Sequence, residues 1–184
     1  IVSVEVDLRR GIPAIDIVGL ADGAVKESRE RMQAAVRNSG FEFPPERVLI
    51  SLSPADLKKE GAGFDLPVAL GILNAKEDSG FIEENVLVMG ELELSGRVRA
   101  VKGIHAACST ASGSGIQYAI VPKANFEEAC SVQGLKVAGV ESLEEAVSAL
   151  KDVTCFGKAF EIKEESAKSV SFSNGMDENV DGLE

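Results

Sequence analysis

The sequence predicts an α+β domain with a mixed sheet and packed helices. Two strand patterns open the chain, and strand and helix patterns then alternate to about residue 150, as expected for strands and helices over one sheet. The chain of 184 residues is 45% hydrophobic and 27% charged, which is sufficient for one buried core. No segment approaches the roughly 20 apolar residues that a membrane helix requires, so we expect no membrane partner.

The first third of the chain predicts two strands and a helix. Residues 2–8 alternate apolar and polar side chains, as in a half-buried strand, and residues 14–19 form a second strand after a turn. Asp22 is expected to cap a helix that runs to about Ser39 and ends at Gly40. The buried face of this helix is expected to carry Val25, Met32, Ala35 and Val36.

A glycine-rich turn, residues 59–67, links a strand at 47–52 to an apolar helix that begins near Phe64. The first amides of that helix lack intrahelical partners, which suits an anion or an oxyanion. Asp65, in the first turn, is expected to cap such amides. A strand, a glycine turn and a helix N-terminus are what an acyl-transfer site needs, but this turn carries no Ser, Cys or Thr. The sequence therefore predicts the scaffold of a peptidase site without its nucleophile.

The helix that follows this turn is apolar nearly all round and should be the central buried helix. Beyond it we expect strands over 86–92, 97–101, 118–121 and 135–138, and a helix over 103–112. Asn125 and Ser142 each stand three residues before a Glu, so both are expected to form capping boxes of short helices. We assign residues 1–155 to the domain and residues 156–184, which carry few apolar side chains, to a linker or disordered tail.

The rest of the sequence gives little support for a metal, nucleotide or DNA site. His105 is the only histidine, and the three cysteines lack metal-ligand spacing, so we expect no metal site and reduced cysteines in a cytoplasmic protein. Gly61 and Gly63 supply only part of a nucleotide-binding loop, so no cofactor is expected in this fragment. The net charge of −11 predicts weak DNA binding or none.

A family resemblance adds to these observations. Residues 16–31, 38–41 and 52–61 resemble the Mg-chelatase-like AAA+ ATPases of the ComM/YifB type, over roughly residues 1–150. The resemblance implies an N-terminal domain with the two-layer fold of the Lon protease proteolytic domain, related to domain 2 of ribosomal protein S5. It also implies a first strand ahead of Ile1 and an ATPase module after the domain. Because the chain opens without Met, we expect it to be a fragment.

The same resemblance places the catalytic positions of Lon. The serine position falls on Gly63 and the lysine position on His105, and we expect the two to face each other across one cleft. A Ser–Lys dyad needs a hydroxyl beside a desolvated amine, so the resemblance implies that peptidase chemistry is absent. Lys102, one helical turn before His105, could only partly substitute. The other candidate cleft residues are Gly61, Ala62, Phe64 and Asp65.

The resemblance implies a non-catalytic accessory domain of a homo-hexameric AAA+ motor. The motor would use ATP and Mg²⁺, bound by the ATPase module, and would act in DNA processing: branch migration, recombination and natural transformation. DNA would be bound through the full-length protein. Two alternatives remain open: a residual hydrolase that uses Ser53 or Cys108, and a Mg-chelatase subunit of tetrapyrrole synthesis.

Overall fold

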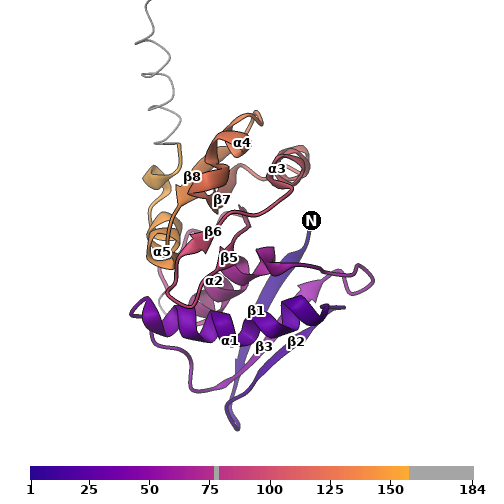
Figure 1. The fold of residues 1–184 in the computed structure, drawn as a ribbon, viewed down its shortest axis with the longest axis vertical. Helices are drawn as coiled ribbons and strands as arrows, with labels where there is room; N and C mark the ends of the chain where they lie inside the picture. The colour runs from indigo at the N-terminus through magenta and orange to yellow at the C-terminus, as the bar shows by residue number, and fades with distance from the viewer. Residues whose placement is uncertain (77–78, 158–184) are drawn as a thin grey trace, which may run out of the picture.

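The computed structural model describes residues 1–76 and 79–157, which form an α+β fold (Figure 1). In the described residues, two three-stranded sheets and one two-stranded hairpin are accompanied by five α-helices. The expectation of an α+β architecture with a mixed sheet is confirmed, but the expectation of one sheet is wrong, because the early and late strands belong to different sheets.

The first sheet contains β1 (Ser3–Arg9), β2 (Ile15–Val18) and β3 (Arg47–Ser53) in the order β1-β3-β2. Strand β3 is antiparallel to β1 and parallel to β2, so the two strands predicted at the start of the chain do not pair with each other. Strand β3 lies at the centre of the sheet, and it is the one strand of the three that has buried side chains. The side chains that it buries are Val48, Ile50 and Leu52.

Helix α1 (Gly23–Asn38) lies along this sheet in Figure 1 and follows the prediction closely. The Asp22 side chain accepts a hydrogen bond of 2.8 Å from the amide of Val25, which confirms the predicted cap. The predicted buried face is also confirmed, because Val25, Met32, Ala35 and Val36 are fully buried.

Helix α2 (Asp65–Ala75) follows a 3-10 turn, η1 (Ala62–Phe64), and is the central buried helix. It packs against β1, α1, β5 and α5. Gly71 lets α2 approach β1 closely, because a Cβ at this position would lie 2.9 Å from Cγ2 of Val6. The prediction of a helix buried nearly all round is confirmed.

The second sheet consists of β4 (Val86–Val88), β7 (Tyr118–Pro122) and β8 (Lys136–Val140), all parallel. Helices α3 (Ile104–Gly113) and α4 (Phe126–Cys130) connect its strands. A second apolar core lies here; its buried members are Ile104, Cys108, Ala119, Val121, Ala129 and Val137.

The single strand predicted over residues 86–92 is wrong. The chain breaks at Gly90: β4 joins the second sheet, whereas β5 (Glu91–Leu92) pairs with β6 (Val98–Arg99). A Cβ at Gly90 would lie 2.9 Å from Leu66 Cδ2 and 2.9 Å from Val98 Cγ1, so only glycine fits where the chain crosses α2.

One of the two predicted N-caps forms, but its capping box is incomplete, because the Glu145 carboxylate accepts from the Glu141 amide at 2.7 Å and not from the amide of the cap residue. At the start of α5 (Leu143–Lys151), the Ser142 hydroxyl accepts from the Glu145 amide at 3.2 Å. The prediction for Asn125 is wrong, since its side chain does not cap α4. Instead it bonds the amide of Val101 at 3.0 Å and the carbonyl of Val101 at 2.9 Å, and so fixes the segment before α3.

The end of the described chain packs onto the second sheet. After the turn η3 (Val153–Cys155), the buried ring of Phe156 meets the ring of Tyr118 edge-on, with 5.1 Å between centroids. Phe156, the first residue of the predicted tail, is thus part of the core. From residue 158 onward, the predicted linker lies outside the described residues.

Candidate functional site

The glycine turn forms as a strand-turn-helix connection, but its amides are not left open. Gly61 has φ 85°, in the left-handed region that favours glycine, and η1 and α2 follow. The Leu66 amide, in the first turn of α2, donates to the Gly90 carbonyl at 3.0 Å, and the Gly90 amide donates to the Gly63 carbonyl at 3.1 Å. The predicted set of free amides is therefore reduced, because Gly90 pairs with the turn like an added strand residue.

Asp65 is not the helix cap that the sequence predicts. Its carboxylate is fully buried, accepts from the Leu92 amide at 3.1 Å and lies 3.4 Å from the guanidinium nitrogens of Arg31. Burial raises the pKa of Asp65 from its ordinary value of 3.8, whereas the Leu92 amide and Arg31 act in the opposite direction. The side chain therefore connects α2 to β5 and α1, a structural role.

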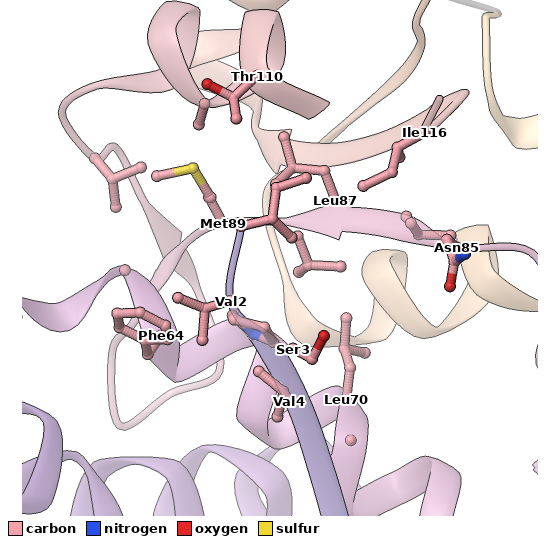
Figure 2. A pocket seen from close by; sticks show the side chains of 18 of the residues that line it. Val2, Ser3, Val4, Phe64, Leu70, Asn85, Leu87, Met89, Thr110 and Ile116 are labelled. Carbon is pink, nitrogen blue, oxygen red and sulfur yellow. The ribbon is translucent and has the colours of Figure 1, made fainter. Parts of the chain in front are cut away.

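A cleft of about 1250 Å³ opens beside the glycine turn, between the start of β1, strand β4 and helix α3 (Figure 2). Its wall is largely apolar; the labelled apolar side chains in Figure 2 are Val2, Val4, Phe64, Leu70, Leu87, Met89 and Ile116. Thr110 of α3 lies across the cleft from β1.

Most of the candidate cleft residues line this space, but two do not. Gly61, Ala62, Gly63, Phe64 and Lys102 all contribute to the wall. Among the described residues, Lys102 is exposed and has no ion pair or side-chain hydrogen bond. Since Asp65 is buried behind the turn, it takes no part in the cleft.

His105 is absent from the cleft wall. The residues of α3 that line the cleft are Ala106, Ala107 and Thr110, whereas Ile104 and Cys108 face the core. At 100° per residue, His105 lies on the side of α3 away from the cleft-facing stripe. Its exposed position is next to Glu128, whose carboxylate accepts from the His105 amide at 3.1 Å. The structure thus puts Lys102, and not His105, on the cleft that Gly63 lines.

The two alternative nucleophiles lie outside the cleft wall. Ser53 ends β3, and Cys108 is fully buried under α3. Burial, with smaller contributions from Glu128 and Cys130, raises the pKa of the Cys108 thiol to about 11. Because the thiolate is the reactive form, a buried thiol with this pKa is a poor nucleophile near neutral pH.

Three hydroxyl groups of the described residues line the cleft: that of Ser3 at the start of β1, and those of Thr110 and Ser114, which bond carbonyls of the α3 segment. The Thr110 hydroxyl donates to the Ala106 carbonyl at 2.9 Å, and the Ser114 hydroxyl donates to the Thr110 carbonyl at 2.9 Å. No bond in the described part of the chain joins Lys102 to a hydroxyl group. Residues 1–76 and 79–157 also hold no group of three His, Cys, Asp or Glu side chains that could bind a metal.

Sequence reasoning missed Lys59, which is 1% exposed. Its ammonium donates to the Pro54 carbonyl, and its backbone bonds both Leu20 and Asp22. Lys59 thereby holds the loop after β3 against the start of α1. The neighbouring Lys58 is exposed and pairs with Glu60, so nothing in the local pattern distinguishes the two lysines. None of the helices in the described ranges combines the length and apolar character needed to cross a bilayer.

Comparison with known proteins identifies the family. Residues 4–125 match the model of the family described as subunit ChlI of Mg-chelatase. Competence protein ComM of Haemophilus influenzae is 36% identical over 179 residues, which is 96% of this chain and 35% of that protein. The protein YifB of Escherichia coli is 41% identical over 135 residues, which is 72% of this chain and 26% of YifB.

A more distant similarity concerns a protease. The archaeal Lon protease of Methanocaldococcus jannaschii is 27% identical over 142 residues, which is 77% of this chain and 22% of that protein. The chain spans about a third or less of these relatives. The chain belongs to the ChlI family of Mg-chelatase-related proteins, together with ComM and YifB.

Proposed function

We propose that this chain is a Lon-protease-like accessory domain, without peptidase activity, of a cytoplasmic ComM-type AAA+ ATPase that acts in DNA processing. Membership of the ChlI family supports an origin in a Mg-chelatase-like ATPase. The similarity to Competence protein ComM favours recombination and natural transformation as the setting. The similarity to the archaeal Lon protease supports a fold of the Lon proteolytic type.

The observation that carries the non-catalytic assignment is the composition of the cleft. Gly63, at the serine position that the Lon resemblance implies, has no side chain, and a Cβ built there would meet only Val101 Cγ1, at 3.9 Å. His105, at the implied lysine position, faces away from the cleft wall. A covalent mechanism needs a nucleophile within hydrogen-bond reach of a base, and the described cleft has no such pair.

The rest of the proposal concerns the full-length protein. The ATPase module would bind ATP and Mg²⁺, assemble as a homo-hexamer and contact DNA. The present chain carries a net charge of −11, and duplex DNA is bound mainly through clustered Lys and Arg. The accessory domain would therefore support assembly or substrate guidance and would leave DNA contact to the motor.

The family description also names Mg-chelatase, which favours a second candidate, a subunit for metal insertion in tetrapyrrole synthesis. The extensive match to ComM, over 96% of this chain, makes the DNA-processing assignment the stronger one. A chelatase role requires that the full-length protein support Mg²⁺ insertion into a porphyrin, and we expect no such activity.

The test compares the full-length protein, a version that lacks residues 1–157, and the present chain alone. We expect the full-length protein to hydrolyse ATP and migrate branched DNA, and the present chain to bind DNA negligibly at physiological salt. The shortened version should lose assembly or DNA migration. Micromolar DNA binding by the present chain, falling steeply with added salt, would contradict the accessory assignment. Absence of DNA-dependent activity in the full-length protein would contradict the DNA-processing role.

A further inference from the structure

We propose that the cleft binds an extended polypeptide segment of a partner protein, which adds as a strand to the free edge of β4. This inference goes beyond the accessory-domain proposal and does not depend on the ATPase assignment, because it rests on the backbone and side chains of the cleft alone. The mode is strand addition, in which backbone hydrogen bonds provide affinity and pockets for alternate side chains provide selectivity.

The first step is the edge of β4. In the described residues, β4 is an edge strand of its sheet, with β7 on one side. The Met89 amide donates to the Ile120 carbonyl at 3.1 Å, and Val88 is the register partner of Ile120. In a parallel ladder alternate residues of a strand bond the same neighbour, so Leu87 and Met89 bond β7, while Val86 and Val88 point their backbone groups to the other side.

The second step is what this edge faces. Both Val86 and Val88 line the cleft, and the start of β1, also an edge strand, lines it from the opposite sheet. Figure 2 shows Val2, Ser3 and Val4 of this segment beneath Leu87 and Met89. The cleft thus lies between the exposed edges of two sheets. Exposed edges are templates for an added strand.

Strand addition also continues a pairing that the protein already makes. Immediately after β4, the Gly90 backbone pairs with Gly63 and Leu66 of the glycine turn. The turn therefore occupies the extension of the same strand at one end and leaves Val86 and Val88 open. A segment that pairs with these residues would lie in line with the turn, along the length of the cleft.

The third step concerns size and charge. A volume of about 1250 Å³ exceeds the roughly 300–1000 Å³ of typical small-ligand pockets, so a polypeptide segment suits the cleft better than a small molecule. Glu84 and Glu91 line the cleft without an ion pair in the described residues, and Lys102 is the one lysine among the described lining residues. The segment is therefore apolar at alternate positions and carries Lys or Arg near its ends.

The test uses the present chain and a fluorescein-labelled peptide, Lys-Thr-Val-Thr-Val-Thr-Val-Lys, in fluorescence anisotropy titrations. Two matched peptides carry N-methyl groups on one or the other alternate set of residues. Because only one set of amides pairs with β4, one N-methylated peptide should lose about tenfold or more in affinity while the other binds like the parent. Amide hydrogen exchange at Val88 should slow in the complex.

Two tryptophan substitutions on α3, one inside the cleft and one outside it, test where the peptide binds. Ala106 is exposed and lines the cleft, so Ala106→Trp should fill it and weaken binding about tenfold or more. Ser109 is equally exposed on α3 but does not line the cleft, so Ser109→Trp is the control and should bind as the unmodified chain does. Thermal unfolding of both variants checks that the fold is kept.

Several outcomes would overturn the proposal. These are the absence of saturable binding at about 1 mM peptide, equal binding by all three peptides, or equal loss in the two tryptophan variants. Self-association of the chain that Ala106→Trp abolishes, with no peptide binding, would identify a second copy as the occupant and would also overturn it.

Discussion

Asp65 joins three elements through one buried carboxylate. It accepts from the Leu92 amide of β5 and lies 3.4 Å from Arg31 of α1, while it begins α2 itself. Asp65→Ala leaves the Leu92 amide without its acceptor and Arg31 without its carboxylate. We expect a loss of about 2–4 kcal/mol in the free energy of unfolding, measured by urea denaturation. Asp65→Asn keeps an acceptor for Leu92 and should lose less; equal losses would contradict this account.

The pKa of Asp65 predicts a pH dependence with a definite sign. Because burial raises the pKa above 3.8, the folded state binds the proton more tightly than the unfolded state does. Ionisation of Asp65 therefore costs stability above the folded pKa, and this cost disappears as the pH falls toward 3.8. Relative to Asp65→Asn, the unmodified chain should gain unfolding free energy between about pH 7 and pH 4. If the difference in unfolding free energy between the unmodified chain and Asp65→Asn stays constant or shrinks over this range, the pKa of Asp65 is not raised.

Gly19 and Gly61 separate backbone strain from steric overlap. Both have positive φ, 105° and 85°, but a Cβ at Gly19 would lie 2.0 Å from the Leu52 carbonyl oxygen, while a Cβ at Gly61 meets nothing within 4 Å. Gly61→Ala should cost about 1 kcal/mol from strain alone, and Gly19→Ala about 3 kcal/mol or more. Chemical denaturation of the two variants measures both costs. Similar costs would mean that β3 moves to accept the methyl group.

Helix α1 shows what a single cap contributes to an element. Asp22 accepts from the Val25 amide, and its own carbonyl accepts from Lys26. Asp22→Ala should lower the free energy of unfolding by about 1 kcal/mol, because one amide loses its partner. Asp56, exposed in the loop after β3, is the control, and Asp56→Ala should change stability by less than about 0.5 kcal/mol. Equal effects of the two variants would show that the bond between the Asp22 side chain and the Val25 amide does not stabilise the fold.

The elements that the sequence predicted correctly are those set by local pattern. The buried face of α1 follows from the helical period, and the burial of α2 from its lack of polar faces. The break at Gly90 could not be predicted in the same way, because its cause is the contact with Leu66 and Val98 from other parts of the chain. Asn125 has the residue pattern of a cap, yet it bonds Val101, a tertiary contact that no local pattern contains.

The candidate site likewise has features that the local sequence predicts and features that depend on tertiary packing. The turn at residues 61–64 and its place beside a buried helix follow from the glycines and the apolar run. Whether His105 or Lys102 faces the cleft depends on the rotation of α3, which the packing of Ile104 and Cys108 fixes. Burial of Lys59 rather than Lys58 depends on the path of the loop after β3.

At the scale of the whole molecule, the two sheets and α2 surround one large and mostly apolar cleft. The glycine turn and the start of β1 line one side of the cleft, and β4 of the second sheet and α3 line the other (Figure 2). The chain thus combines a large apolar cleft with two cleft hydroxyl groups, of Thr110 and Ser114, that bond carbonyls of α3. This combination suits a binding or assembly role better than hydrolysis.

The central claim, that the domain does not act as a peptidase, is tested most directly by incubating the chain at high concentration with fluorescein-labelled casein. We expect no turnover from the unmodified chain. Gly63→Ser together with His105→Lys should fold, since a Cβ at Gly63 meets only Val101 Cγ1 at 3.9 Å, yet give little turnover because His105 lies away from the cleft. Turnover by the unmodified chain that Ser53→Ala or Cys108→Ala abolishes would contradict the claim and establish a residual hydrolase.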